Sequence, residues 1–193
     1  MNTTEKKKKT KTLSNRTFLR MFFKQPKVNA SITPSSKRAA RAMVRGLALG
    51  KMEYVVELGP GTGVFTDILA EKLPPTAKVL LIELEESFIE NLRNKYDDRF
   101  EVVQCSACEL GALLEERGIK KVDLIISGLP YNMPEEVKTK LQSTLLKLTN
   151  EGTCMRWFTY FPFLMKPHYS QFKMKLAHFI MWNFPPMWIY TVN

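Results

Sequence analysis

Histidine and cysteine, the side chains that most often bind transition metals, are scarce in this sequence. The 193 residues include two histidines and three cysteines. Cys105 and Cys108 form a Cys-x-x-Cys pair, but a structural zinc site needs four ligands, and His168 and His178 lie ten residues apart. Because three cysteines cannot all pair, we expect free thiols in a reducing cytoplasm and no bound metal.

Apolar runs of the roughly 18 residues that cross a bilayer are also absent. The apolar stretch at 177–192 comes closest, and it is interrupted by Asn183, Pro185 and Pro186. The sequence also opens without the apolar segment of a secretory signal. We therefore expect a cytoplasmic protein that lies on a membrane at most and does not cross it.

Acidic residues are almost absent from residues 1–27, where Glu5 is outnumbered by nine lysines and arginines in a chain of net charge +10. Such an arm attracts anionic lipid or nucleic acid. Within it, residues 16–27 show a helical period with one apolar and one basic side. The apolar side holds Phe18, Leu19, Phe22 and Phe23, and the basic side holds Arg16, Arg20, Lys24 and Lys27.

A helix with these two sides is typical of a membrane interface. An ordinary helix packed on the body of the protein needs the same apolar side, and the first dozen residues also suit a solvated tail. We predict that residues 1–27 form a membrane-binding arm and that residues 28–193 form one domain.

The remaining sequence alternates apolar, strand-like runs with helical ones. The predicted strands cover residues 54–58, 78–83, 100–104, 122–127 and 153–160. The predicted helices cover residues 34–48, 64–72, 87–96, 110–117 and 134–148. Two further runs, 178–182 and 187–192, predict a terminal hairpin. This order predicts an α/β, Rossmann-like fold, with helices on both faces of a mostly parallel, seven-stranded sheet that ends in an antiparallel hairpin.

The clearest functional motif is Val-Glu-Leu-Gly-Pro-Gly-Thr-Gly at residues 56–63, where the first predicted strand meets its helix. Glycines there let the backbone approach a ligand in the crevice of a doubly wound sheet. Glu57, just before the loop, opposes a pyrophosphate but attracts the cationic S-adenosylmethionine (SAM). The spacing is Gly-x-Gly-x-Gly and not the Gly-x-Gly-x-x-Gly of dinucleotide enzymes. Glu83, at the end of the second strand, is placed to accept hydrogen bonds from ribose hydroxyls.

A second motif, Ser-Gly-Leu-Pro-Tyr-Asn-Met-Pro at residues 127–134, lies at the carboxyl end of the fourth predicted strand. Together with the glycine loop, Ser-Ile-Thr-Pro-Ser-Ser at 31–36 and Asn-Phe-Pro-Pro at 183–186, it resembles the bacterial phospholipid N-methyltransferases. These class I enzymes convert phosphatidylethanolamine stepwise to phosphatidylcholine, with SAM as methyl donor. The resemblance covers residues 29–193 and depends on the co-occurrence of all four segments.

This resemblance implies a SAM site, from which S-adenosylhomocysteine leaves as the product. Its expected residues are Ser31, Thr33, Glu57, Gly59, Gly61, Thr62, Gly63, Glu83, Leu84, Ser106, Ala107 and Ser127. Ser106 stands where relatives often carry an aspartate, so it offers the SAM adenine a weaker hydrogen bond. The expected lipid site consists of Gly128, Leu129, Pro130, Tyr131 and Tyr160.

Tyr131 and Asn132 are the predicted catalytic residues. The expected reaction is direct displacement, in which the lipid nitrogen attacks the SAM methyl group and no covalent enzyme intermediate forms. The Tyr131 ring would face the amine and its cationic products, and Asn132 would orient the headgroup. Core packing is the alternative interpretation of these aromatic residues, for Tyr160 in particular. The expected partner is an anionic membrane, at the inner face of the cytoplasmic membrane; the sequence predicts no oligomeric state.

The related ribosomal RNA adenine dimethyltransferases share the glycine loop and the Glu83-type acid, so nucleic-acid adenine methylation is the alternative function. In those enzymes an asparagine at the position of Gly128 accepts a hydrogen bond from the adenine amino group. Glycine offers no such acceptor, and the sequence stops at Asn193 without room for their helical RNA-binding domain. We therefore favour a lipid amine over nucleic acid. A SAM-binding scaffold without catalysis is a third interpretation, which the intact motifs disfavour.

Overall fold

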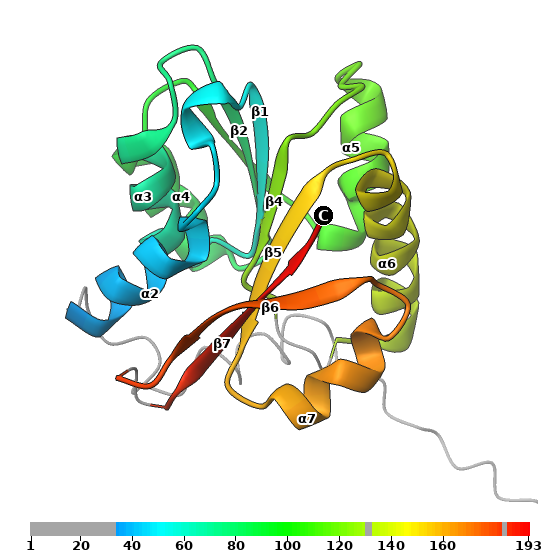
Figure 1. The fold of residues 1–193 in the computed structure, drawn as a ribbon. Coiled ribbons are helices and arrows are strands. Elements are labelled where there is room, and N and C mark those ends of the chain that lie inside the picture. Colours follow the sequence, from blue (N-terminus) through cyan, green and yellow to red (C-terminus); the bar gives the residue numbers. More distant parts are fainter. Residues whose placement is uncertain (1–33, 130–132, 183–184) are drawn as a thin grey trace, which may run out of the picture.

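The computed structural model describes residues 34–129, 133–182 and 185–193. Its centre is a seven-stranded sheet in the order β3-β2-β1-β4-β5-β7-β6 (Figure 1). The strands are β1 (Tyr54–Leu58), β2 (Lys78–Glu83), β3 (Phe100–Gln104), β4 (Leu124–Ser127), β5 (Cys154–Thr159), β6 (Met174–Ile180) and β7 (Met187–Val192). Of these strands only β7 runs against the others, and it pairs with β5 and β6. The predicted Rossmann-like class I fold is confirmed.

Helices cover both faces of the sheet (Figure 1). One face carries α2 (Pro34–Val44), α3 (Val64–Lys72) and α4 (Glu86–Lys95), and the other carries α5 (Leu110–Glu116), α6 (Glu135–Asn150) and α7 (Pro162–Met165). Three short 3-10 helices complete the fold: η1 (Leu49–Lys51), η2 (Ala107–Glu109) and η3 (Lys166–Tyr169). Within the described ranges, no helix has the length and apolar character to cross a membrane.

The central strands are apolar on both sides because each side faces a separate core. Val55 and Leu81 pack in the core under α2, α3 and α4. Their neighbours Val56 and Leu80 pack in the core under α5, α6 and α7. Continuous apolar strands of this kind are typical of parallel sheets that are covered on both faces. The sheet is therefore a rigid platform for the loops at its edges.

Three differences from the sequence prediction are larger than the shifts of one or two residues at the other element ends. The helix expected over 34–48 ends at Val44, because Gly46 adopts a left-handed conformation with φ of 78° and turns the chain earlier than Gly50. The strand expected over 178–182 covers Met174–Ile180 instead. Residues 162–169, for which no element was predicted, form α7 and η3. Proline at the first position of α7 is the local signal for that helix start.

Candidate cofactor and active site

Parallel pairing brings four loops to one edge of the sheet. Leu58 is in register with Ile82 on one side and with Ser127 on the other. Glu83 is in register with Gln104. The carboxyl ends of β1, β2, β3 and β4 therefore lie side by side. The chain order reverses at β1, between β2 and β4, and such a switch point is where open α/β sheets bind their ligands.

The glycine loop after β1 is built from left-handed backbone conformations. Gly59, Gly61 and Gly63 have φ angles of 69°, 56° and 82°, which residues with a Cβ atom adopt at a cost. The Gly59 N–H donates to the Ile82 carbonyl at 2.9 Å, and the Gly63 N–H donates to Pro60 at 2.9 Å. The loop thus turns tightly between β1 and α3 and is fixed to β2.

Glu83 fastens this loop to the end of β2. Its carboxylate is buried, with 2% of the side chain exposed, and accepts hydrogen bonds from the N–H groups of Gly61 at 3.0 Å, Leu84 at 2.8 Å and Glu85 at 2.9 Å. Burial raises the pKa of Glu83, and these three donors oppose the rise. A carboxylate has about four acceptor sites, so one site is left for a ligand hydroxyl.

Glu57 lies beneath the loop and is fully buried. Its Oε2 accepts a hydrogen bond from the Thr66 hydroxyl at 2.7 Å, while Oε1 is buried without a partner among the described residues. Burial raises the pKa of Glu57 to about 8, and the Thr66 hydrogen bond only partly opposes this. Without a ligand, Glu57 is therefore a neutral acid behind the loop at neutral pH. The sequence pattern alone predicts a carboxylate here that attracts the cationic ligand.

Tyr96, which the sequence analysis missed, clamps the end of the glycine loop. Its hydroxyl contacts the Gly63 carbonyl at 2.9 Å and Asp67 Oδ1 at 2.8 Å. Burial and the hydrogen bond with Asp67 raise the pKa of Tyr96. A Cβ at position 63 would lie 2.3 Å from the Tyr96 hydroxyl oxygen. Glycine at position 63 therefore suits both the φ angle and the contact with Tyr96. Because Gly63 and Tyr96 are 33 residues apart in the sequence, no local sequence pattern reveals this contact.

The end of β3 lies next to Glu83. The Cys105 N–H donates to the Glu83 carbonyl at 3.1 Å. The half-buried Ser106 directly precedes η2, and its hydroxyl accepts a hydrogen bond from the Cys108 thiol at 3.2 Å. Ala107 is buried beside it. Ser106 and Ala107 thus lie at the same edge of the sheet as the glycine loop.

The end of β4 meets the glycine loop at van der Waals distance. The Gly128 N–H donates to the Leu58 carbonyl at 2.8 Å. A Cβ at position 128 would lie 2.9 Å from the Gly59 carbonyl oxygen, and one at position 59 would lie 3.0 Å from Leu129 Cδ2. The Ser127 side chain is buried, and its hydroxyl lies 3.5 Å from the Leu129 nitrogen. Predicted cofactor and lipid residues therefore meet at Gly59.

Several predicted site residues lie outside the described residues. They are Ser31, Thr33, Pro130, Tyr131 and Asn132, with the arm residues Arg16, Phe18, Leu19, Arg20, Phe22, Phe23 and Lys24. Tyr160 is described: it is half-buried, and its ring packs edge-on against Phe158 at 5.6 Å, on the α2–α4 side of the sheet. Its role in binding lipid stays a prediction.

The cysteines and acidic residues of the described chain do not gather into a metal site. Cys105, Cys108 and Cys154 are free, and burial raises the pKa of Cys105 to about 11. No group of three His, Cys, Asp or Glu side chains in the described ranges is placed to hold a metal ion.

Comparison with known sequences gives two kinds of relative. The family described as ribosomal RNA adenine dimethylase matches residues 12–158. The ornithine lipid N-methyltransferase of Singulisphaera acidiphila is 32% identical over 158 residues, which cover 80% of this chain and 82% of that protein. The ribosomal RNA small subunit methyltransferase A of Cupriavidus metallidurans is 38% identical over 84 residues, which cover 42% of this chain and 28% of that protein.

Solved structures of methyltransferases share the fold. TrmN from Thermus thermophilus superposes with a TM-score of 0.60 at 19% identity, covering 83% of this chain and 51% of that one. The O-methyltransferase TomG from Streptomyces achromogenes, in complex with SAM, has a TM-score of 0.60 at 15% identity, covering 91% and 95%. With its glycine loop at the switch point of this fold and a family match over 12–158, the chain belongs to the ribosomal RNA adenine dimethylase family and is a SAM-dependent methyltransferase.

Proposed function

We propose that this methyltransferase transfers methyl groups from SAM to the amine of a membrane-lipid headgroup. Two lipids supply that chemistry. One is phosphatidylethanolamine, which the sequence motifs imply and which would be converted toward phosphatidylcholine. The other is an ornithine lipid, the substrate in the name of the Singulisphaera relative. The extent of similarity supports a lipid, because the aligned region covers 82% of that relative but 28% of the Cupriavidus ribosomal RNA methyltransferase.

The contact between Gly128 and Gly59 carries the proposal. A Cβ at position 128 would lie 2.9 Å from the Gly59 carbonyl oxygen and 3.6 Å from that of Leu58. The asparagine that the adenine-methylating relatives use as an acceptor would therefore force this backbone to shift. The nitrogen of adenine has its lone pair delocalised into the ring and needs such acceptors. An alkyl amine has a localised lone pair and needs mainly to be neutral and in line with the methyl group.

The described residues fit SAM, which supplies a methyl group on a positively charged sulfur. The three left-handed glycines present backbone and no side chain to the crevice. We assign ribose binding to the remaining acceptor site of Glu83 and adenine binding to Ser106, with Leu84, Ala107 and Ser127 in the wall. Glu57 acts from behind the loop, because a bound cation lowers the pKa of a nearby acid and favours its carboxylate.

The lipid amine must lose a proton before it can attack. An alkyl ammonium titrates near pH 10, like lysine, and desolvation lowers that value. The apolar Leu129 side chain, packed against Gly59, would supply part of this apolar wall. Orientation of the amine then provides much of the rate. We assign this role to Pro130, Tyr131 and Asn132, with Tyr160 as a further candidate contact.

The basic arm at residues 1–27 completes the proposal. A lipid substrate stays in its bilayer, so the enzyme must bind reversibly at the surface. Clusters of basic residues attract anionic leaflets, and the aromatic side predicted for residues 16–27 adds apolar burial. We propose peripheral association with an anionic membrane through this arm.

The test is methyl transfer from radiolabelled SAM to three vesicle preparations of equal surface charge. One contains phosphatidylethanolamine, one contains ornithine lipid, and one contains neither; ribosomal RNA is assayed in parallel. Labelled mono-, di- or trimethylated lipid identifies the substrate and shows how many methyl groups are added. A protein that binds SAM but labels neither lipid would reject the proposal.

Adenine methylation of ribosomal RNA is the second candidate, because the family that matches residues 12–158 carries that name. Labelled adenine in RNA, with unlabelled lipid, would establish it. The same experiment therefore separates the two functions.

A further inference from the structure

The exposed large apolar side chains of the described chain all lie between residues 161 and 182. Six of them form what we call the apolar rim: Phe163, Leu164, Leu176, Phe179, Met181 and Trp182. Phe163 is 87% exposed and Trp182 is 82% exposed. Exposed apolar side chains gathered in this way mark a contact with a membrane or a partner.

Two elements build the rim and meet in a groove. Phe163 and Leu164 belong to α7, and the other four belong to β6 or to the turn that follows it. Phe163, Leu176 and Trp188 line a shared groove of about 560 Å³. The Phe179 ring lies 4.7 Å from that of Trp188. The groove joins α7 to the outer face of the β6–β7 hairpin, so the two halves of the rim form one surface.

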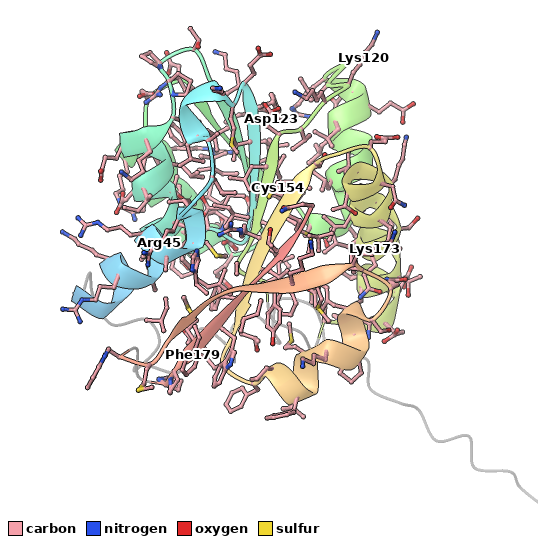
Figure 2. The ribbon with its side chains drawn as sticks, in the orientation of Figure 1. Arg45, Lys120, Asp123, Cys154, Lys173 and Phe179 are labelled. Atoms are coloured by element: carbon pink, nitrogen blue, oxygen red, sulfur yellow. The ribbon has the colours of Figure 1, made fainter. Side chains whose placement is uncertain are left out.

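The rim lies at the edge of the sheet that holds the cofactor crevice. Ser127, Trp157 and Tyr190 are in register across β4, β5 and β7. Because β7 runs against β5, the turn before β7 projects beyond the carboxyl ends of β4 and β5. α7 follows the carboxyl end of β5. In Figure 2, Phe179 lies near α7 at this end of the molecule, and Lys120 lies at the opposite end.

The surface around the rim is basic and holds no acid from its own segment. No aspartate or glutamate occurs between residues 152 and 193. Lys166 is exposed and lines the groove between α7 and the hairpin. Lys173 and Lys175 are exposed too, but they lie at the other end of β6 from Phe179 (Figure 2). Apolar side chains beside a lysine complement the acyl chains and phosphates of an anionic bilayer.

A second copy of the chain fits this surface less well. A symmetric dimer pairs the same patch with itself, so Lys166 of one copy would approach the basic patch of the other. An anionic bilayer meets the same patch with opposite charge. The charge pattern therefore favours lipid over self-association.

We infer that the apolar rim inserts into the interface of an anionic bilayer while Lys166 contacts its phosphates, which turns the cofactor site toward the membrane. The rim is a second membrane contact, built into the catalytic domain and separate from the arm at residues 1–27. This inference rests on the proposed function, in which the substrate is a bilayer lipid.

The test compares the full-length wild-type protein with two variants that change net charge equally. F163E/W182E alters the rim, and K120E alters the opposite end of the molecule. Co-sedimentation uses vesicles of phosphatidylglycerol and phosphatidylcholine, which carry no methyl-accepting amine. We expect F163E/W182E to bind at least about tenfold more weakly than wild type and K120E to bind within about twofold. Melting temperature and SAM affinity, expected to be unchanged, show that both variants are folded.

A fluorescence readout isolates the rim from the arm. The chain has three tryptophans, and Trp157 is 1% exposed. Brominated acyl chains are expected to quench wild-type fluorescence, and W182Q is expected to keep only the quenching of Trp188, which lines the groove, even where it still sediments with vesicles. Quenching in W182Q that equals wild type would show that Trp182 does not insert.

Equal vesicle binding by F163E/W182E and K120E would overturn the inference, and so would wild-type protein that ignores anionic vesicles. The proposed function fails differently. If the rim variant loses binding while wild type methylates neither lipid, the docking surface stands and the lipid substrate is rejected. If wild type methylates lipid and the rim variant binds and methylates equally well, the substrate stands and the rim is rejected.

Discussion

Two acids flank the glycine loop in different environments. Glu83 accepts three backbone N–H groups, which stabilise its carboxylate against the effect of burial. Glu57 has one hydroxyl donor and a buried oxygen without a described partner. Its proton is therefore retained to about pH 8. The free energy of unfolding of the SAM-free protein should therefore change with the protonation of Glu57.

Glu57 makes the protein less stable as the pH rises. In the unfolded chain its carboxyl ionises near pH 4.5, and in the folded protein near pH 8. Between these values the folded state holds a proton that the unfolded state has released, so the free energy of unfolding falls until about pH 8 and then levels. Glu57→Gln cannot titrate. We expect the SAM-free wild type to lose at least about 3 °C more than E57Q in melting temperature between pH 5.5 and 8.5; parallel curves would contradict this.

SAM binding should release the same proton. A cation bound over the loop lowers the pKa of Glu57, so at pH 7 wild-type protein gives up part of a proton that E57Q does not have. Calorimetry of SAM binding in buffers with different ionisation enthalpies measures this release. An identical buffer dependence in the two proteins would show that Glu57 does not sense the cofactor.

Gly128 tests whether the backbone contact with Gly59 matters. Gly128→Ala places a Cβ 2.9 Å from the Gly59 carbonyl oxygen, and neighbouring backbone must shift, at a cost of about 1–3 kcal/mol. Because Gly59 belongs to the cofactor loop, SAM affinity should fall with stability. Gly50→Ala is the matched control, since nothing lies within 4 Å of its added Cβ. Urea unfolding and SAM titration measure both; a G128A protein as stable and as tight-binding as G50A would refute the contact's importance.

At the scale of elements, α2 depends on a buried arginine. Arg156 of β5 donates from Nη1 to the carbonyls of Met43 at 3.2 Å and Arg45 at 3.3 Å. His178 of β6 lies 3.3 Å from the same Arg45 carbonyl. Burial lowers the pKa of the Arg156 guanidinium, because removing its charge from water costs free energy. The end of α2, marked by Arg45 in Figure 2, is thereby held against the sheet.

Removing this arginine should loosen α2. Arg156→Met keeps the apolar stem but leaves the Met43 carbonyl without its described side-chain donor, at an expected cost of about 1–3 kcal/mol. Arg117→Met, which breaks a more exposed pair with Glu101, should cost less than about 1 kcal/mol. Hydrogen exchange should speed up in α2 of R156M only. Equal destabilisation of the two variants would show that the α2 contacts contribute nothing specific.

At the scale of the whole molecule, the exposed apolar surface gathers at one end. The rim and Lys166 follow the carboxyl end of β5 or precede β7, at the sheet edge where the glycine loop lies. A membrane bound at that end would face the crevice. The opposite end of the sheet, marked by Lys120 and Asp123 in Figure 2, would face away from it.

Vesicle binding should therefore weaken with salt but not vanish. The Debye length falls from about 10 Å at 0.1 M salt to about 3 Å at 1 M, which screens the lysines and the arm, while insertion of apolar side chains persists. We expect affinity for anionic vesicles to fall at least about tenfold over this range, and K166Q to show a shallower slope. Co-sedimentation with vesicles at a series of salt concentrations measures this affinity. An affinity independent of salt would argue that charge plays no part.

The limits of sequence reasoning follow from the range of the interactions. Strands 54–58, 78–83 and 100–104 were predicted with their observed ends, because apolar periodicity and glycine are local signals. The end of α2 was misplaced because Gly46 and Gly50 both suit a helix stop. The short α7 was missed because four residues are too few to show a period. Of the predicted cofactor residues in the described chain, those after β1, β2, β3 and β4 do meet at one edge.

The sequence by itself determined the strand order along the chain, the helices between the strands, the glycine loop and the methyltransferase class, since each depends on neighbouring residues. Tertiary structure alone decided that β7 lies between β5 and β6 and that Tyr96 clamps Gly63. It also decided that Gly128 leaves no space beside Gly59 and that Glu57 holds a proton. These properties arise from contacts between residues 9 to 69 positions apart, and from burial, which depends on every element that packs around a side chain.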